Sequence, residues 1–343
     1  SPTRRLIQLT AVFSVLVAAE LGEAASRPNV IVIVSDDAGY NDLGFSAALT
    51  GTPTTAVTPH LDALAQQSVV VSQGYAAPVC SPTRVGLLTG VYQQKQGVER
   101  VLGNDLSETW GLDPSIPTVA DRMKSLGYTT GAIGKWHIGY QDGINRPNDV
   151  GFDEYFGFLS GNRHYFNEGA VVNQMLRNDT NVEALWRTEG DHSLYETTGA
   201  ARGRYVTDAF GEESADFITR HANEAEPFFL YSAFSAPHDI YDSKQQDYDL
   251  FANISDPNKR TDAAMVYALD RAVGMITDAV DNAGIADNTV IIFINDNGAP
   301  GDGYHDNSPF RGFKATTWEG GIRVPYFIKA PGVTMGRVAG TRR

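Results

Sequence analysis

The sequence predicts an α/β fold, doubly wound, in which a mostly parallel sheet is flanked by helices. Three observations lead to this class: continuous β-branched runs that are typical of strands buried on both faces, amphipathic helical segments between them, and polar clusters directly after four strands. The 343 residues suffice for one large domain with a sizeable core.

The first half of the chain supplies three strands and two helices. An uninterrupted β-branched run over 29–34 predicts the first strand. A Thr-Pro pair, which provides an N-cap and a first-turn proline, starts a helix over 58–67, and Val-Val-Val at 69–71 predicts the next strand. Apolar residues at helical spacing predict a helix over 117–126, which a glycine ends before a strand over 128–133.

The second half continues the alternation after a long irregular stretch. Residues 139–203, rich in Asn, Gly and aromatic residues, predict an excursion near the ligand crevice that would supply substrate specificity. A helix over 206–221 then precedes a buried strand over 227–234. The longest helix is expected over 262–282, and a β-branched run over 289–294 predicts the last parallel strand.

Polar side chains follow four of these strands, at the point where each strand ends. They are Asp36 and Asp37, Lys135 and His137, His238, and Asp296 and Asn297. Because open parallel sheets place their ligand crevice at the carboxyl ends of the strands, one crevice could collect all four groups. Three carboxylates and an amide oxygen are hard ligands, which suit calcium or magnesium better than zinc. Taken separately, an Asp-Asp pair or an Asp-Asn-Gly segment is usually only a turn or a cap.

Cys80 is the single cysteine of the chain, so it cannot form an intramolecular disulfide. It lies just before the helix-like segment 85–89, with Pro82 at a favourable first-turn position. The positive end of a helix suits a nucleophile or a bound anion. The alternative is an inert buried thiol, which is the more common state of a lone cysteine.

Charge restricts the classes of partner. The formal net charge of −14 argues against a nucleic-acid partner, because phosphate backbones attract basic surfaces. An anionic substrate would need local positive charge, from arginine, lysine or a metal, to overcome the overall field.

The amino terminus has the layout of a secretory signal peptide over residues 1–25: two arginines, an apolar run over 6–19, and then small residues. The run is short and interrupted by polar residues, which favours cleavage over a stable membrane span. We therefore expect a secreted or periplasmic protein, or a lysosomal one in a eukaryote, with one domain over 27–343.

A family resemblance rests on several ordered motifs. Cys80-Ser81-Pro82-Thr83-Arg84 matches the Cys-x-Pro-x-Arg signature of type I sulfatases, and Gly-Lys-Trp-His at 134–137 matches their second signature region. The Asp-Asp pair at 36–37 and Asp-Asn-Gly at 296–298 match the metal-binding segments of that family. From about residue 27 to about residue 331 the chain resembles these arylsulfatase-like members of the alkaline phosphatase superfamily. The resemblance implies an alkaline-phosphatase-like fold, a catalytic domain over 27–343, and hydrolysis of sulfate monoesters of small molecules or carbohydrates.

The resemblance also implies the maturation and the metal of the site. A formylglycine-generating enzyme would oxidise Cys80, and the hydrated aldehyde would attack sulfur with one hydroxyl and expel sulfate through the other. A calcium ion, or magnesium, would be held by five positions, namely Asp36, Asp37, Cys80, Asp296 and Asn297.

Roles for five further residues come from the same resemblance. Arg84 and Lys135 would orient and stabilise the formylglycine hydrate. Lys314 and His238 would bind sulfate oxygens, and His238 or a neighbouring group would protonate the leaving oxygen. His137 would act as a base when the aldehyde is regenerated. Without the family match, each of these side chains would have an ordinary surface or loop role.

Several alternatives stay open at this point. Arg163 and His164 either line the substrate pocket or hold a loop. Asp239 follows His238 in a segment where many relatives carry a proline, so substrate contacts would differ there. The chain stops soon after 324–329, and we expect the small C-terminal antiparallel domain of the relatives to be missing. The alternative functions are phosphate or phosphonate ester hydrolysis and an inactive secreted glycan-binding protein.

Overall fold

The computed structural model describes residues 27–166, 185–188, 194–196, 204–333 and 335–338. The expected signal peptide lies outside these residues. The strands are β1 Asn29–Asp36, β2 Val69–Val71, β3 Gly74–Tyr75, β4 Thr129–Lys135, β5 Glu154–Phe158, β6 Trp186–Thr188, β7 Leu194–Glu196, β8 Phe228–Pro237, β9 Thr289–Asn295, β10 Arg323–Val324, β11 Tyr326–Lys329 and β12 Gly336–Val338. The helices are α2 Gly44–Thr50, α3 Pro59–Gln66, α4 Cys80–Thr89, α5 Val119–Ser125, α6 Val206–His221, α7 Gln245–Asp249, α8 Pro257–Asn282 and α9 Glu319–Ile322, with short 3-10 turns η1 Gln93–Gln96, η2 Pro147–Val150 and η3 Ala286–Asn288.

A ten-stranded sheet forms the middle layer, in the order β12-β2-β11-β9-β1-β8-β4-β5-β6-β7. The five strands from β9 to β5 are parallel, whereas β11 and β6 each run antiparallel to both neighbours. Strands β3 and β10 form a separate antiparallel pair. The predicted doubly wound, mostly parallel α/β fold is therefore confirmed.

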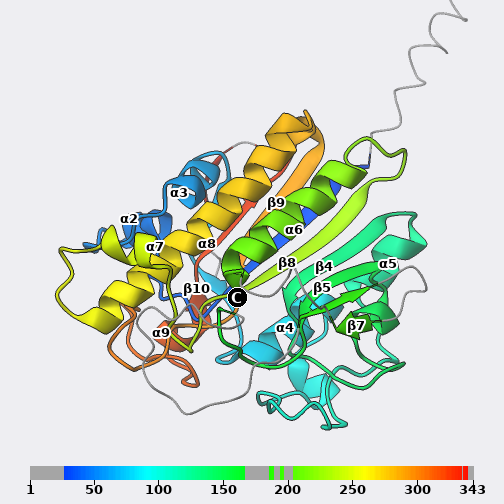
Figure 1. Cartoon of the computed structure of the whole chain (residues 1–343), viewed down its shortest axis with the longest axis horizontal. Coiled ribbons are helices and arrows are strands. Elements are labelled where there is room, and N and C mark those ends of the chain that lie inside the picture. The colour runs from blue at the N-terminus through cyan, green and yellow to red at the C-terminus, as the bar shows by residue number, and fades with distance from the viewer. Residues whose placement is uncertain (1–26, 167–184, 189–193, 197–203, 334, 339–343) are drawn as a thin grey trace, which may run out of the picture.

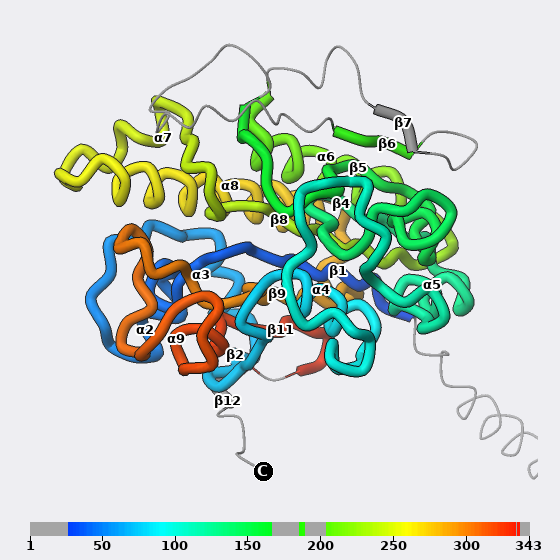
Figure 2. Tube along the Cα trace, turned by 90° about the horizontal axis from the view of Figure 1, so that it is seen from below, coloured from blue at the N-terminus to red at the C-terminus, as the bar shows by residue number. Residues whose placement is uncertain are grey.

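Both faces of the central strands are buried, which explains their uninterrupted apolar runs. In β1, Ile31 and Ile33 pack in one core with α3, α6 and α8, whereas Val32 and Val34 pack in a second core with α4 and α5. Figure 1 shows α6 and α8 side by side across the sheet. Figure 2, turned by 90°, places α7 and α8 above β1. In the described part of the chain, no helix combines the length and apolarity needed to cross a membrane.

Two elements differ from the sequence-based expectation. The stretch 139–203 contributes β5, which pairs parallel with β4 inside the sheet. Helix α8 begins at Pro257, ahead of the predicted residue 262, because Asp256 caps it by accepting hydrogen bonds from the backbone N–H groups of Asn258 and Lys259 at 2.9 and 3.3 Å.

The strand register aligns the carboxyl ends at one edge of the sheet. Ser35 of β1 lies opposite Asn295 of β9, and Gly134 of β4 lies opposite Ala233 of β8. Gly134 has φ +109°, and a Cβ atom there would lie 1.9 Å from the carbonyl oxygen of Ala233. Only glycine permits this close approach, which brings the following residue, Lys135, to the shared edge.

Candidate active site

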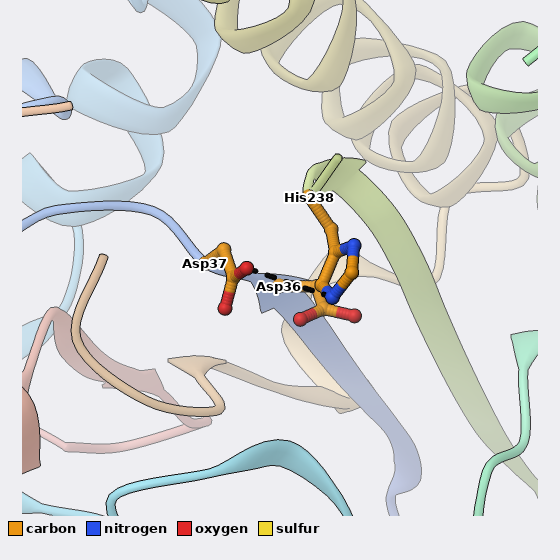
Figure 3. Close-up of side chains that lie close together, drawn as sticks. All are labelled: Asp36, Asp37 and His238. Atoms are coloured by element: carbon orange, nitrogen blue, oxygen red, sulfur yellow. Dashed lines mark ion pairs between the residues drawn. The ribbon is translucent and has the colours of Figure 1, made fainter. Parts of the chain in front are cut away.

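Four strand ends deliver charged side chains to one point at the carboxyl edge of the sheet. Strand β1 ends in Asp36, β4 ends in Lys135, His238 follows β8, and Asp296 follows β9. All four are buried, and neither Asp36 nor Asp296 has any exposed surface. Figure 3 shows Asp36 and Asp37 beside the ring of His238. The structure thus brings together the polar clusters that follow the strands in the sequence.

The backbone is strained at two of these turns. Asp37 and His137 have positive φ angles of 67° and 58°, a region that residues other than glycine rarely occupy. The turn at Asp37 brings its carboxylate to Nδ2 of Asn297, which donates to Oδ1 at 2.6 Å. Nζ of Lys314 donates to the other oxygen of Asp37 at 2.8 Å. The unusual backbone therefore positions side chains of the cluster.

Arg84, on α4, links three strand ends. Its Nε and Nη2 donate to Oδ2 of Asp296 at 3.0 and 2.9 Å, and Nη2 also donates to Oδ2 of Asp36 at 3.2 Å. Its Nη1 donates to the carbonyl oxygen of Lys135 at 3.1 Å, and Nζ of Lys135 in turn donates to Oδ2 of Asp36. Because these groups are fully buried, removing one of them would leave its partners without compensation for their charge or their hydrogen bonds.

The carboxyl end of the sheet presents oxygen atoms that suit a hard cation. Burial, and then the facing carboxylate of Asp36, raise the pKa of Asp296 to about 8. Among the described residues, Oδ1 of Asp36 and Oδ1 of Asn297 are buried oxygens without a hydrogen-bond partner. Ligand atoms of Asp36, Asp37 and His238 lie within 4.8 Å of one another. Hard oxygen donors in this arrangement could hold a divalent cation such as calcium or magnesium.

Cys80 is the first residue of α4, and it is 1% exposed. Its Sγ lies 3.3 Å from Nδ1 of His137, and Nε2 of His137 lies 2.9 Å from the carbonyl oxygen of Leu102. Because a carbonyl only accepts, Nε2 carries the hydrogen and Nδ1 turns a lone pair toward residue 80. Burial, and then the charge of Lys135, lower the pKa of His137 well below its ordinary value. The ring is therefore a neutral base beside the cysteine.

Lys314 and His238 flank Asp37. Burial opposes the charge of Lys314, but Asp37, Cys80 and Asp36 together outweigh it and raise the pKa of this lysine above its ordinary range. His238 lies with Nε2 3.6 Å from Oδ2 of Asp37 and with Nδ1 2.8 Å from Oδ1 of Asp239. Burial, Lys314 and Lys135 all oppose a positive charge on His238, but the nearby carboxylates, among them Asp37 and Asp36, leave its pKa raised overall. Two cationic donors therefore stand at the outer side of the cluster.

Arg163 and His164 support the loop that follows β8. Nε of Arg163 donates to the carbonyl oxygen of His164 at 3.1 Å, and Nδ1 of His164 lies 3.4 Å from Oδ2 of Asp242. The hydroxyl of the next residue, Tyr165, lies 2.7 Å from the carbonyl oxygen of Ser235 and 2.9 Å from that of His238, and its one hydrogen points toward both acceptors. These contacts favour the loop-holding alternative for the pair.

A cavity of about 420 Å³ opens beside Asp37 and Lys314. Its lining residues are Asp37, Asp239, Ile240, Tyr241, Pro300, Asp302, Tyr304 and Lys314. Sequence reasoning missed Tyr241, Asp302 and Tyr304, because they lie in loops without a motif or an apolar period. The only signal was their position, shortly after the polar residues that end β8 and β9.

Comparison with known proteins identifies the relatives of this chain. The family model described as Sulfatase matches residues 28–340. Arylsulfatase J of Mus musculus is 31% identical over 318 residues, which cover 91% of this chain and 50% of that protein. N-acetylgalactosamine-6-sulfatase of Homo sapiens is 34% identical over 332 residues, which cover 92% of this chain and 59% of that protein. This chain thus spans about half to three fifths of these two relatives.

A solved structure agrees with these sequence matches. Ps i-CgsB in complex with k-i-k-neocarrahexaose superposes with a TM-score of 0.81 at 34% sequence identity. The superposition covers 91% of this chain and 68% of that one. The fold and nearly the whole chain are therefore shared with that protein.

Proposed function

Because the chain belongs to the sulfatase family, we propose that it hydrolyses sulfate monoesters, with residue 80 as the nucleophile after oxidation of Cys80 to formylglycine. The observation that carries this proposal is the position of Cys80 at the start of α4, with its Sγ 3.3 Å from the unprotonated Nδ1 of His137. Relatives such as the N-acetylgalactosamine-6-sulfatase support a sulfated sugar as the substrate class.

A divalent cation completes the proposal. Calcium, with magnesium as the alternative, would be held by the oxygens of Asp36, Asp37, Asp296 and Asn297 together with residue 80. The buried Oδ1 atoms of Asp36 and Asn297, which lack partners among the described residues, support this assignment. When bound, the cation would polarise the sulfate oxygens and lower the pKa of the attacking hydroxyl.

The positive side chains would bind and orient the sulfate. Lys314 and His238 would donate hydrogen bonds to its oxygens, since both flank Asp37 at the cavity. Lys135 and Arg84 would hold the carboxylates in place and supply positive charge near residue 80. Donors fixed in a buried site stabilise developing negative charge without rearranging, which is the largest contribution in many enzymes. His238, or a group beside it, would also protonate the leaving oxygen.

His137 would accept a proton from residue 80. Its Nδ1 lone pair faces that residue, and the hydrogen bond from Nε2 to the carbonyl oxygen of Leu102 fixes the tautomer. Its lowered pKa keeps the ring neutral, so the base form is available at neutral pH.

The test is to coexpress the chain with a formylglycine-generating enzyme and to measure oxidation of residue 80 by peptide mass spectrometry. Sulfate release from 4-nitrocatechol sulfate should rise in proportion to formylglycine content and should be lost in Cys80→Ala. Oxidised protein that releases no sulfate from aryl or sugar sulfates would contradict the proposal. Turnover of a matched aryl phosphonate instead would favour the phosphonate hydrolase, and turnover of neither would favour the inactive glycan-binding alternative.

We also infer export of the protein, with residues 1–25 as the cleaved signal and the catalytic domain after it. The motivation is the arrangement of arginines, apolar run and small residues at the amino terminus. Cell fractionation combined with the intact mass of the mature protein checks this, because an unprocessed cytoplasmic product would contradict it.

A further inference from the structure

The cavity beside Asp37 and Lys314 has the size and the lining of a small-ligand site. Its volume, about 420 Å³, lies in the range of roughly 300–1,000 Å³ that is typical of such pockets. Tyr241 and Tyr304 form part of its wall, with ring centroids 5.6 Å apart at 88°, and Ile240 and Pro300 add apolar surface. Aromatic and apolar walls with a few fixed polar groups match a sugar ring, which has an apolar C–H face and a rim of hydroxyls.

A partly buried hydrogen-bonded chain, which ends at the exposed Asp302, fixes the polar side of this cavity. The hydroxyl of Tyr241 donates to Oδ2 of Asp302, because a carboxylate only accepts. The hydrogen of the phenol is therefore committed, and the phenol oxygen must accept from Nε2 of His305, 3.0 Å away. On the other side of the ring, Nδ1 of His305 lies 2.9 Å from Oδ1 of Asp262 and 3.5 Å from Oδ2 of Asp42.

These contacts define the charge of His305. Nε2 carries the hydrogen that the phenol oxygen accepts, and Nδ1 lies at ion-pair distance from two carboxylates without a hydrogen bond of normal geometry, so the surroundings favour a positively charged ring. Its side chain has no exposed surface. Burial opposes this charge, but Asp262 and Asp42 outweigh it and raise the pKa of His305 well above its ordinary value. The cation among Asp42, Asp262 and His305 is thus the histidine itself, and it anchors Tyr241.

Away from Lys314, the network makes the cavity an acceptor of hydrogen bonds and a poor place for a second anion. Asp302 accepts from the hydroxyl of Tyr241 at Oδ2 and from the backbone N–H of Tyr304 at Oδ1, 3.0 Å away, and each oxygen keeps a further lone pair for a ligand. The lining contains three carboxylates, those of Asp37, Asp239 and Asp302, against the single ammonium of Lys314, which pairs with Asp37. A ligand carboxylate or a second sulfate would meet like charge there.

Resting on the proposed function, we propose that this cavity binds the ring of a sulfated neutral sugar, with Asp302 as the acceptor for a sugar hydroxyl. His305 is a positioning residue, which holds Tyr241 and through it Asp302. Sugars that carry a carboxylate or a second sulfate on the same ring are discriminated against.

The substrate test uses matched pairs on the formylglycine-containing protein. Methyl galactoside 2-, 3- and 4-sulfates are each compared with the corresponding galacturonide, and the 6-sulfate is compared with the 3,6-disulfate. We expect kcat/KM for the neutral monosulfate of the accepted pair to exceed that of its partner by about tenfold or more, as one strongly unfavourable charge contact provides. Equal rates within the pair, or turnover of 4-nitrocatechol sulfate without turnover of any sugar, would overturn the inference and leave the proposed function standing. Absence of aryl sulfate turnover would instead count against the proposed function.

Two variants test the named residues. In Asp302→Asn, the ratio of kcat/KM for the neutral sugar to that for the aryl sulfate should fall about tenfold, because a hydrogen bond to a charged acceptor is lost. The matched control is Asp287→Asn in η3, an exposed carboxylate before the amino end of β9, which should leave the ratio unchanged. His305→Gln should raise KM for the sugar with little change in kcat. Equal loss of kcat on both substrates would mean a merely structural histidine and would overturn its assigned role.

Discussion

The buried guanidinium of Arg84 gives the most direct test of how the site is held together. Replacing it by methionine in Arg84→Met keeps an unbranched chain but removes its hydrogen bonds to Asp296, Asp36 and the carbonyl of Lys135. Breaking a buried ion pair by removing one partner costs about 3–5 kcal/mol, because the other charge stays buried without compensation. Lys135 still pairs with Asp36, so Asp296 is the group left alone, and its raised pKa allows it to take up a proton rather than stay charged. We therefore expect the lower end of that range, about 3 kcal/mol.

Urea unfolding at neutral pH in the absence of calcium measures this loss as a change in the free energy of unfolding. The matched control is Arg220→Met, which removes a guanidinium from a surface pair with Glu154, where the arginine side chain is 43% exposed. Exposed pairs contribute about 0–1 kcal/mol, so the control should change little. A loss below about 1 kcal/mol in Arg84→Met, or equal losses in the two variants, would refute the reasoning.

Three further predictions concern the metal, the sheet and the half-buried His221. Calcium at about 100 times its dissociation constant should add about 2.7 kcal/mol to the free energy of unfolding, and Asn297→Leu should lose most of that increment. Urea titrations in calcium and in chelator measure the difference, and equal stability of the unsubstituted protein in both would contradict the metal site. Gly134→Ala should destabilise the fold far more than Gly143→Ala, because the new Cβ of residue 134 would lie 1.9 Å from a carbonyl oxygen. A Cβ at residue 143 meets open space, so that substitution costs only about 1–2 kcal/mol for the left-handed backbone. Similar melting temperatures for the two variants would contradict this prediction. The hydrogen bond to Glu154 raises the pKa of His221, so the protonated ring stabilises the fold below its ordinary pKa of about 6.5, and this is lost as pH rises through the raised value. His221→Gln should therefore lower the melting temperature more at about pH 5.5 than at about pH 9, and an equal shift at both would be evidence against it.

Most of the sheet could be predicted because burial on both faces leaves a simple trace in the sequence. Residues 30–34 of β1 and 290–294 of β9 are apolar at every position, since alternate side chains pack in opposite cores. Strand β5 could not be predicted in the same way. Its residues 154–158 lie in a stretch rich in Gly and Asn, and they form a strand only because β4 lies alongside.

The candidate site likewise has a part that could be predicted from the sequence and a part that could not. Residues directly after strand ends could be predicted, because parallel strands end at a common edge whatever the loops do. The chain from Tyr241 to Asp302 and His305 could not, because its members lie 61 and 64 residues apart in loops that have no period. Contacts of that kind follow from loop conformation, which local sequence patterns do not specify.

The burial of Cys80 would set a time limit on the oxidation proposed for it. Arg84 lies four residues after Cys80, and its contacts are complete only after Asp296 has been synthesised, 212 residues later. Ribosomes add about 5–20 residues per second, so about 10–40 seconds pass before the covering part of the sheet even exists. During that interval the thiol is accessible to a modifying enzyme, and in the finished fold it is 1% exposed. The yield of modified protein would thus depend on a race between oxidation and folding, and slower folding would favour the modified form.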